Sequence, residues 1–413
     1  MTDVEPEVDP AAEPLLFPLP RKDPLAMPPE YAGLVGGGCP VRGVMRQGGR
    51  KVWALSQHEH VQQVLADATL SSNGKHPAYP IVFPIPEEFI DIVELPLVAM
   101  DPPGHTVQRR LLIPEFTAKR IQTLRPRIQQ LVDERITAML EKGGPVDLVR
   151  ELAVPLPCGL FCELLGVPGT DADFFRRFAE ATTNRNATPE EAGALHLEMD
   201  AYLERVVTEK TKNPGDDLLS RVIRKNAEEP DEAKRLKHSS LVTVAKMLVY
   251  GGFDTTANMI SLGTVVLLQH PEQLAEIREN PELTWNAIDE LLRFLSIEDA
   301  ATVRVATRDL EIGGVLIREG EGMVALNGAA NWDEKVFPDP GAFDIHRETK
   351  GHLAFGYGMH QCLGANLARV ELEIVFNTLL TRIPGLRLAE PVEQLPFKHD
   401  AHIYGIYELP VTW

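Results

Sequence analysis

Apolar residues recur at three- and four-residue spacing over long stretches of the chain from Pro114 onward, with charged residues between them. This period matches one face of an α-helix. It predicts helices over Ala118–Leu140, Asp171–Glu180, Pro189–Lys212, Asp216–Asn226, Thr284–Phe294 and Leu363–Leu380. The fold class is therefore expected to be mainly α.

Strand-like pieces are short, and in them β-branched residues alternate or cluster beside glycine. They lie at Lys51–Ala54, Thr302–Ala306, Leu310–Ile312, Gly322–Ala325 and Ile403–Leu409. A small β-rich region beside a large helical part follows. Residues 1–20 are rich in proline and acidic residues and lack the basic-then-apolar run of a signal peptide. We expect a flexible N-terminus there, followed by a single domain over residues 21–413.

The charge and the cysteines narrow the class of protein. The 413 residues include 41 basic and 60 acidic ones, a net charge of −19, which disfavours non-specific binding to nucleic acid or to an anionic membrane. The four cysteines, Cys39, Cys158, Cys162 and Cys362, have neither zinc-type CxxC spacing nor the density of a disulfide-rich secreted domain. A cytoplasmic protein is expected. Cys158 and Cys162 lie in an apolar run and are interpreted as core residues.

The longest apolar region, Leu241–Leu268, contains Lys246, Asp254 and two adjacent glycines, which favours a buried central helix over a membrane span. Each glycine inside a helix costs roughly 1 kcal/mol relative to alanine, so the pair at Gly251 and Gly252 indicates a need for space. Thr255 is placed to bond a carbonyl of the preceding turn. Asp254 and Thr255 together suit proton relay. A kinked core helix with a polar flank is the alternative.

A glycine-rich segment, Phe355–Gly364, precedes the last predicted helix and contains Cys362. Gly356 and Gly358 permit backbone conformations in which main-chain N–H groups point at an anion, and a thiolate is such an anion. A position at a helix N-terminus would favour the ionised sulfur further. A structural cysteine in a tight turn is the alternative. A phosphate-binding P-loop is excluded because no Gly-Lys-Ser/Thr follows.

The pattern Phe-Gly-x-Gly-x-His-x-Cys-x-Gly at Phe355–Gly364 resembles the haem-binding signature of the cytochrome P-450 superfamily, with all six fixed positions present. The segment Gly251–Thr256 is similar to the oxygen-binding motif of that family, with Gly251 where alanine is frequent and Asp254 as one of the two common acids. The resemblance implies a cytochrome P-450 fold. It implies that heme b, iron protoporphyrin IX, lies between the central helix and the cysteine loop. Cys362 is then the metal ligand, and Asp254 and Thr255 are the catalytic pair.

The resemblance covers the chain from about Met100 to the C-terminus and extends to further residues. Glu290 and Arg293 look like the structural Glu-x-x-Arg pair of the family, with Arg347 as its third member. The residues expected at the cofactor, most of them at its propionates, are His105, Arg109, Arg304, His360, Phe355, Gly356 and Gly252. Positions similar to those of the family, together with apolar character, indicate a substrate lining of Phe83, Val93, Leu97, Leu248, Ala300 and Ile403.

The sequences of several segments look like those of soluble actinobacterial members of this family, which oxidise macrolides, terpenoids or drugs. By that similarity the chain is expected to be a monomeric monooxygenase that inserts one oxygen atom of O2 into a C–H bond of a hydrophobic small molecule. A separate ferredoxin and ferredoxin reductase would supply electrons, docking on basic residues at Arg109, Arg110, Lys350 and Arg369. Oxidative coupling or ring-bridge formation is one alternative. The other, a non-turnover haem-thiolate binding protein, is disfavoured by Asp254 and Thr255.

Overall fold

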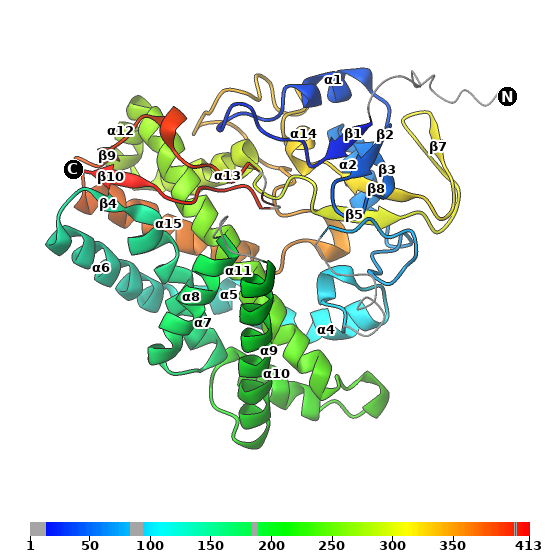
Figure 1. The fold of residues 1–413 in the computed structure, drawn as a ribbon, viewed down its shortest axis with the longest axis horizontal. Helices are drawn as coiled ribbons and strands as arrows, with labels where there is room; N and C mark the ends of the chain where they lie inside the picture. Colours follow the sequence, from blue (N-terminus) through cyan, green and yellow to red (C-terminus); the bar gives the residue numbers. More distant parts are fainter. Residues whose placement is uncertain (1–13, 83–93, 184–188, 400, 402) are drawn as a thin grey trace.

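Helices dominate the computed structural model, which describes residues 14–82, 94–183, 189–399, 401 and 403–413 (Figure 1). The mainly α class predicted from the sequence is confirmed. The α-helices are α1 Glu30–Gly37, α2 His58–Ala66, α4 Gly104–Leu112, α5 Ala118–Gln122, α6 Arg125–Lys142, α7 Pro155–Leu165, α8 Ala172–Thr183, α9 Pro189–Lys212, α10 Leu218–Ala227, α11 His238–Gln269, α12 Pro271–Glu279, α13 Thr284–Leu295, α14 Asn327–Asn331 and α15 Ala365–Arg382.

The strands form three small sheets in the described residues. The largest has the order β1-β2-β3-β8-β5, and the others are β4-β10-β9 and β6-β7. Their bounds are β1 Leu15–Phe17, β2 Val41–Met45, β3 Lys51–Leu55, β4 Val146–Asp147, β5 Thr302–Val305, β6 Leu310–Ile312, β7 Val315–Ile317, β8 Gly322–Ala325, β9 Arg387–Leu388 and β10 Pro410–Thr412. Figure 1 shows the five-stranded sheet at one side of the molecule, beside α1, α2 and α14.

Two expectations near the chain ends are corrected. Leu15–Phe17 forms β1 and pairs in parallel with β2, and Phe17 is fully buried, so the predicted flexible N-terminus does not extend through residues 15–17. Ile403–Leu409 is not a strand and makes only an isolated bridge, between Ile406 and Phe397. Its backbone bonds instead go to separate segments, such as that from the Tyr404 N–H to the Ile297 carbonyl.

Several predicted helices have different bounds in the structure, among them Ala118–Leu140 and Leu363–Leu380. The stretch Ala118–Leu140 is two helices, because Pro126 in the first turn of α6 has no N–H to donate and favours a new helix start. The last long helix, α15, begins at Ala365 after a Gly364 cap rather than at Leu363. Cys362 therefore lies in the loop before the helix and is not part of its first turn.

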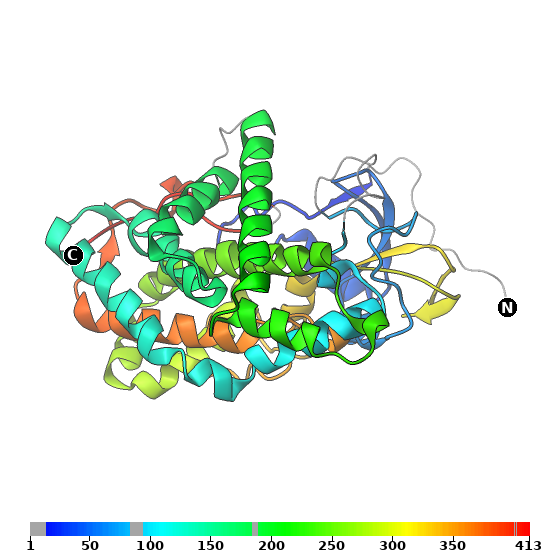
Figure 2. The same cartoon turned by 90° about the horizontal axis from the view of Figure 1, so that it is seen from below.

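The helix α11 is the centre of the helical part. Figure 2 shows it running through the molecule, with α9 standing across it. Most of its residues are buried in one large apolar core that also contains residues of α6, α7, α13 and α15. Cys158 and Cys162 of α7 belong to this core, as predicted. No helix in the described ranges is long and apolar enough to cross a membrane.

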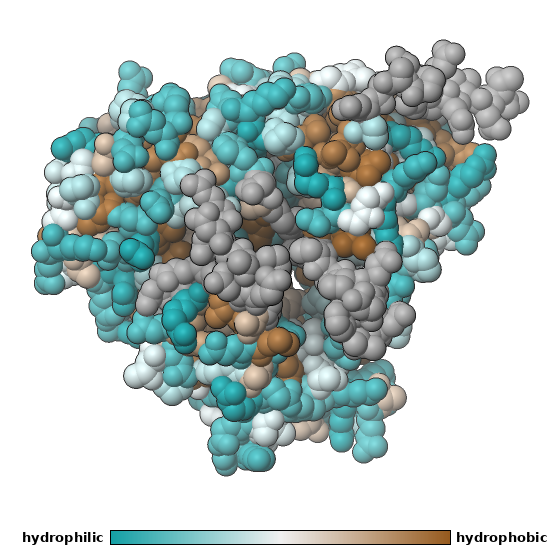
Figure 3. All heavy atoms as spheres, viewed as in Figure 1, coloured by the Kyte–Doolittle hydropathy of each residue, from teal (hydrophilic) through white to brown (hydrophobic). Residues whose placement is uncertain are grey.

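Hydrophilic residues cover most of the described surface on the face drawn in Figure 3. Exposed large apolar residues are scattered, for example Val98, Leu197 and Trp285. Scattered apolar side chains of this kind are ordinary on a protein surface. The functional site is therefore expected inside the fold.

Glu371 of α15 is a buried carboxyl, 2% exposed, and its Oε2 has no hydrogen-bond partner among the residues that the structure describes. Burial raises its pKa from 4.5 to about 8. Because the folded pKa is the higher one, stability is lost as pH rises from about 4.5 through about 8. At about 1.4 kcal/mol per pKa unit, the full loss of folding free energy is roughly 5 kcal/mol. Relaxation of the structure around the ionised Glu371 makes the actual loss smaller. We expect Glu371→Gln to stabilise the protein by about 3 kcal/mol at pH ~8.5 and much less at pH ~5.5.

Thermal unfolding of the protein at these two pH values measures the effect. The control is Glu373→Gln on the same helix, which removes the 2.7 Å ion pair between Glu373 Oε2 and Arg125 Nη1 and is expected to lower stability slightly. A Glu371→Gln protein whose stability advantage does not grow with pH would contradict the prediction.

Candidate active site

The loop that carries Cys362 is held by its own backbone and by α2. The Cys362 N–H donates to the Phe355 carbonyl at 2.8 Å, and the Gly356 N–H donates to the Leu353 carbonyl at 2.9 Å. Gly358 has φ +73°, and a Cβ there would lie 2.2 Å from the Leu65 carbonyl oxygen. Only glycine permits that conformation and that approach. The loop is therefore positioned against the end of α2.

Cys362 keeps accessible surface, although burial raises the pKa of its thiol to about 11. The negative charge of Glu298 raises this pKa further. The residue is thus accessible while the surrounding protein desolvates its sulfur. The Gly364 N–H and the charges of Arg109 and Arg369 act in the opposite direction but do not outweigh burial.

This result corrects the expectation that the loop by itself favours the thiolate. The helix begins too late to cap the sulfur, and burial is the dominant influence on its pKa. Ionisation therefore requires a positive charge beside Cys362, and a metal cation bound to the sulfur supplies one. The described residues contain no cluster of three or more His, Cys, Asp or Glu that would hold a metal without a further group.

The two glycines of α11 have different neighbours. Gly251 is exposed although it lies in the middle of α11, and a Cβ added to it would meet nothing within 4 Å. A Cβ on Gly252 would lie 2.2 Å from the Phe161 ring of α7. Gly251 therefore borders open space, whereas Gly252 is required for helix packing. The predicted contact of Gly252 with a cofactor is not supported by this geometry.

Thr255 and Asp254 lie one turn after these glycines. The Thr255 hydroxyl donates to the Gly251 carbonyl at 2.8 Å, the back-bond that the sequence predicts. Asp254 Oδ1 accepts from Lys398 Nζ at 3.2 Å, and Lys398 Nζ also donates to Asn258 Oδ1 at 2.9 Å. Lys398 is 3% exposed, and burial lowers its pKa while Asp254 partly offsets this. No described residue forms a hydrogen bond with Asp254 Oδ2.

His105, His360 and Arg304 gather nitrogen atoms in one place. The two histidine rings have centroids 4.2 Å apart. Both ring nitrogens of His105, Nδ1 of His360 and Nη2 of Arg304 are buried, and none has a hydrogen bond of normal geometry to a described residue, although His105 interacts weakly with the Met359 backbone. Burial and then the charge of Arg304 lower the pKa of His360 to about 3. Within the described part of the chain, these nitrogens therefore have no acceptor.

Arg109 lies one turn after His105 on α4, and its Nη2 donates to the Gln361 carbonyl at 2.7 Å. It therefore ties α4 to the cysteine loop. Its charge acts on both Cys362 and His360. The four predicted donors His105, Arg109, Arg304 and His360 are thus brought together from α4, β5 and the cysteine loop.

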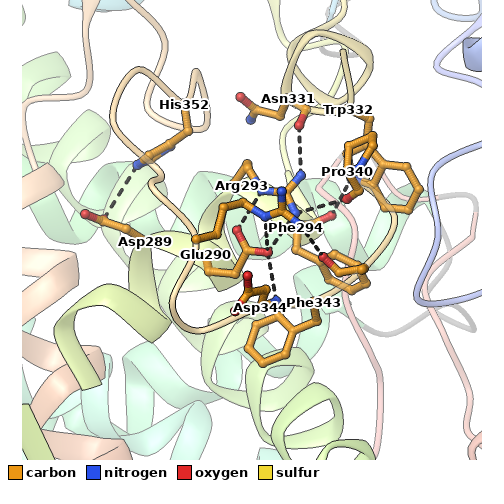
Figure 4. Close-up of polar contacts among 12 residues, drawn as sticks. Asp289, Glu290, Arg293, Phe294, Asn331, Trp332, Pro340, Phe343, Asp344 and His352 are labelled. Carbon is orange, nitrogen blue, oxygen red and sulfur yellow. Dashed lines mark hydrogen bonds and ion pairs between the residues drawn. The ribbon is translucent and has the colours of Figure 1, made fainter. Parts of the chain in front are cut away.

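Glu290 and Arg293 form a buried ion pair (Figure 4), and Arg347 joins it to make an ionic cluster. Arg293 Nε and Nη2 donate to the two oxygens of Glu290 at 2.7 and 2.8 Å, and Arg347 Nε lies 3.1 Å from Glu290 Oε1. The side chains of Glu290 and Arg293 have no exposed surface. Arg293 also donates to the carbonyls of Asn331 and Pro340, so the cluster fixes the segment that leads to the cysteine loop.

The outer side of the cysteine loop has its own contacts. Arg369 Nε donates to Asp289 Oδ1 at 2.6 Å, and the guanidinium lies 4.7 Å from the centre of the Phe355 ring. His352 Nε2 lies 3.6 Å from the same Asp289 oxygen (Figure 4). Phe355 therefore supports the loop from outside. Nothing lies within 4 Å of a Cβ on Gly356, whose φ is +66°.

The six proposed substrate residues are not equivalent. Phe83 and Val93 lie outside the described residues. Leu97 and Ala300 are 3% and 2% exposed, and each packs in a hydrophobic core, so they present little surface to a ligand. Leu248 is 8% exposed, and Ile403 is half-buried.

Two charged residues near Asp254 and Cys362 were missed in the sequence. Lys398 lies in an irregular C-terminal segment, 144 positions from its partner Asp254. Glu298 follows α13 in the connection to β5; burial and then the charge of Asp254 raise its pKa, and its own charge raises the pKa of Cys362. Neither belongs to a local motif. A charge inside a largely apolar segment was the only available signal.

The chain is similar to known proteins over almost its whole length. A sequence profile of the family described as cytochrome P-450 matches residues 190–384. Pentalenic acid synthase of Streptomyces avermitilis is 44% identical over 402 residues, 97% of this chain and 98% of that protein. The 20-oxo-5-O-mycaminosyltylactone 23-monooxygenase of Streptomyces fradiae is 40% identical over 401 residues, 97% and 92% of the two chains. The crystal structure of cytochrome P-450 MoxA from Nonomuraea recticatena has TM-score 0.90 and 45% identity, covering 97% and 98%.

These likenesses, together with the cysteine loop and the central helix, define the class: the chain belongs to the cytochrome P-450 family. The superfamily, the fold and the enzyme class expected from the sequence are confirmed. It is a monooxygenase-type oxidoreductase, and the family implies a haem group. The unpartnered nitrogens of His105, His360 and Arg304 fit the carboxylates of such a group, and Cys362 fits its iron.

Proposed function

We propose that this chain is a heme b monooxygenase that inserts one oxygen atom of O2 into a C–H bond of a hydrophobic small molecule. The reaction is RH + O2 + 2e− + 2H+ giving ROH + H2O. The observations that carry the proposal are the accessible Cys362, the open space at Gly251 and the buried nitrogens of His105, His360 and Arg304 that have no hydrogen-bond partner among the described residues. We infer that these groups border one hollow. The names of the relatives, a 23-monooxygenase among them, support the same reaction type.

Each group at the hollow has a role toward the cofactor. Cys362 would bind the iron, while His105, Arg304 and His360, joined by Arg109, would bind the propionates. Gly251 leaves space on α11. Heme b, when bound, supplies dioxygen binding and reduction at the iron, which no side chain of this protein performs. The chain's own residues orient the substrate and deliver protons.

Proton delivery is assigned to Asp254 and Thr255. Because the Thr255 hydrogen is donated to the Gly251 carbonyl, the oxygen lone pairs are left to accept a hydrogen bond from water. Lys398 donates a hydrogen bond to Asp254 Oδ1, which leaves Asp254 Oδ2 to exchange a proton with water. The ion pair also keeps Asp254 in one orientation. A carboxylate, a hydroxyl and water then form the relay.

Thr255→Ala is expected to release more peroxide per electron and to slow product formation by roughly 100-fold, the lower end of what a positioned proton donor contributes. Peroxide and product are measured together with NADPH consumption. Thr255→Ser keeps the hydroxyl and serves as the matched control. Tight coupling of electrons to product in Thr255→Ala would count against the relay.

We infer that ferredoxin, charged by a separate reductase, donates the electrons to a monomeric, cytoplasmic protein. A surface pocket of about 690 Å³ on the outer side of the cysteine loop includes Lys350, Tyr357, Gln361 and Arg369. Two of the proposed docking charges are already paired, Arg110 with Glu229 and Arg369 with Asp289. Lys350 has no ion pair with a described residue, so it is the cation that best supports docking there.

The proposed function is tested by turnover under isotopically heavy dioxygen. Hydrophobic compounds that shift the haem spectrum from low to high spin are selected and then incubated with ferredoxin, its reductase and NADPH. We expect products that carry one heavy oxygen atom. Products that lose two hydrogens and gain no oxygen would establish oxidative coupling or ring bridging instead. Selected ligands without any product would support a binding protein.

A further inference from the structure

Near the end of the chain, the segments 396–399 and 403–407 lie side by side and are here called the C-terminal turn. The Lys398 N–H donates to the Gly405 carbonyl at 2.8 Å, and a bridge follows at the next pair of residues along the two segments. The backbone of Lys398 is therefore fixed by hydrogen bonding across the turn.

Apolar and backbone contacts anchor the C-terminal turn on the core. Phe397 and Tyr404 are 5% and 6% exposed, and their rings lie nearly parallel with centroids 6.2 Å apart. The Tyr404 N–H donates to the Ile297 carbonyl and the Tyr404 hydroxyl to the Pro24 carbonyl, both at 2.9 Å. These contacts hold the turn without using the Lys398 side chain.

The C-terminal turn meets α11 at Asn258. A Cβ added to Gly405 would lie 2.0 Å from Asn258 Oδ1, so glycine is required for this close approach. Asn258 is 2% exposed and lies one helical turn after Asp254, on the same face of α11. The backbone of the turn thus packs against the face of α11 that carries the acid of the proposed relay.

The Lys398 side chain reaches from the turn to this face and ends at two oxygens. Its Nζ donates to Asn258 Oδ1 at 2.9 Å and to Asp254 Oδ1 at 3.2 Å. The Lys398 side chain is 4% exposed, whereas that of Asp254 is 25% exposed. Among the residues that the structure describes, Lys398 provides the only ion pair of Asp254. Asp254 is thus held at one oxygen by a buried cation and keeps access to solvent.

A buried ammonium group is a costly way to attach a turn that other contacts already hold. The desolvation of a buried ion pair can exceed its attraction, and an apolar side chain of similar volume often stabilises a core equally well. The effect of the pair on Asp254 accounts for it better. A partly exposed aspartate exchanges between rotamers, and a fixed ammonium group selects one of them.

We propose that the C-terminal turn takes part in proton delivery, with Lys398 as the positioning residue that holds Asp254 in the orientation for transfer through water to Thr255. The inference rests on the proposed function, because it takes Asp254 and Thr255 as the relay. Lys398 acts in this role only through Asp254. Proton delivery then depends on a segment 144 positions away from the acid, and a turn displaced from α11 uncouples the reaction.

The first test is a crystal structure of the haem-loaded Lys398→Met protein. Methionine keeps an unbranched side chain and removes the ammonium group. We expect the C-terminal turn in its original place and the Asp254 carboxylate in another rotamer or in several. An unchanged Asp254, or a turn that has left α11 because Lys398 anchors it, overturns the proposal. The structure needs no turnover, so this outcome is independent of the heavy-dioxygen experiment.

The second test is a double-mutant cycle of Lys398→Met and Asp254→Asn. With 7-ethoxycoumarin, ferredoxin, its reductase and NADPH, Lys398→Met should release more peroxide per NADPH and slow product formation by about 10- to 100-fold, as misplacement of a catalytic group does. In the Asp254→Asn background, Lys398→Met should change both values by less than about twofold, because its effect passes through Asp254. Additive losses overturn the proposal. Iodosobenzene supplies an oxygen atom without electrons or protons, so product formed with it should not differ between Lys398→Met and the wild type.

Lys210→Met is the matched control. It removes another Lys–Asp pair of low exposure, in which Lys210 Nζ lies 2.6 Å from Asp217 Oδ2, and it should leave peroxide release per NADPH unchanged. Gly405→Ala tests the same link without removing a charge and serves also if Lys398→Met does not fold. Because its Cβ does not fit against Asn258, it should raise peroxide release per NADPH. A Gly405→Ala protein that couples as tightly as the wild type would contradict the role of the turn.

Discussion

Cys362→Ser is expected to remove the thiolate-type band from the absorption spectrum of the reduced, carbon monoxide-bound protein and to reduce monooxygenase turnover below detection. Sulfur donates electron density to iron far better than a serine hydroxyl, and this donation favours O–O cleavage. The loop itself should survive, because the Cys362 N–H to Phe355 bond and the Gly358 turn do not involve the sulfur. The substitution therefore tests iron ligation by Cys362 without changing the fold of its loop.

Cys39→Ser is the matched control for this experiment. Cys39 is also accessible, but its thiol donates to the Gly313 carbonyl in the β6–β7 turn, remote in sequence from the cysteine loop. Its spectrum and turnover should equal those of the wild type. A thiolate-type band that persists in Cys362→Ser would assign the iron ligand to another residue and end the interpretation of the loop.

Glu290→Ala is expected to lower the free energy of unfolding by about 3–5 kcal/mol, because it leaves the Arg293 charge buried and unpaired. Arg347 loses the same partner, and the Asp344 N–H loses its acceptor, Glu290 Oε1. We expect little soluble, haem-loaded protein at 37 °C. The fraction of purified chain that contains haem and its thermal midpoint measure the effect.

The exposed pair Asp231 and Lys234 offers a control with the same three-residue spacing. Asp231→Ala should leave haem content and thermal midpoint almost unchanged, since water solvates both charges. A Glu290→Ala protein as stable as Asp231→Ala would show that the buried cluster is dispensable. The comparison tests burial, because charge type and sequence spacing are the same in both pairs.

The helices were predictable because their signal is local. Pro189–Lys212 has the bounds that its apolar period predicts, and the apolar run Leu241–Leu268 lies within α11. Ile403–Leu409 has equally good strand residues but lacks a neighbouring strand to pair with. Strand formation depends on partners distant in sequence, and composition alone does not reveal them. The same holds for β1, whose three residues pair with β2.

The residues of the candidate site were predictable only where they belong to a short sequence motif. Thr255, Glu290 and Arg293 belong to short patterns, and the structure shows the Thr255 back-bond and the Glu290–Arg293 ion pair that those patterns predict. Gly252 belongs to a motif as well, but its neighbour is Phe161 of α7, which no local pattern reveals. Lys398 and Glu298 depend on tertiary contacts alone. Sequence patterns thus indicated candidate site residues, whereas charged residues such as Lys398 became visible only through tertiary contacts.

The nitrogen cluster of His105, Arg304 and His360, if it binds the haem propionates as proposed, makes folding depend on the cofactor. Folding without haem buries donors that no described residue accepts, which costs free energy, whereas a ligand that accepts them stabilises only the folded chain. The amount of enzyme that persists after synthesis would therefore follow the cell's supply of haem, since proteases remove chains that unfold more often. Iron starvation would lower the abundance of the protein before it lowered the rate of any single catalytic step.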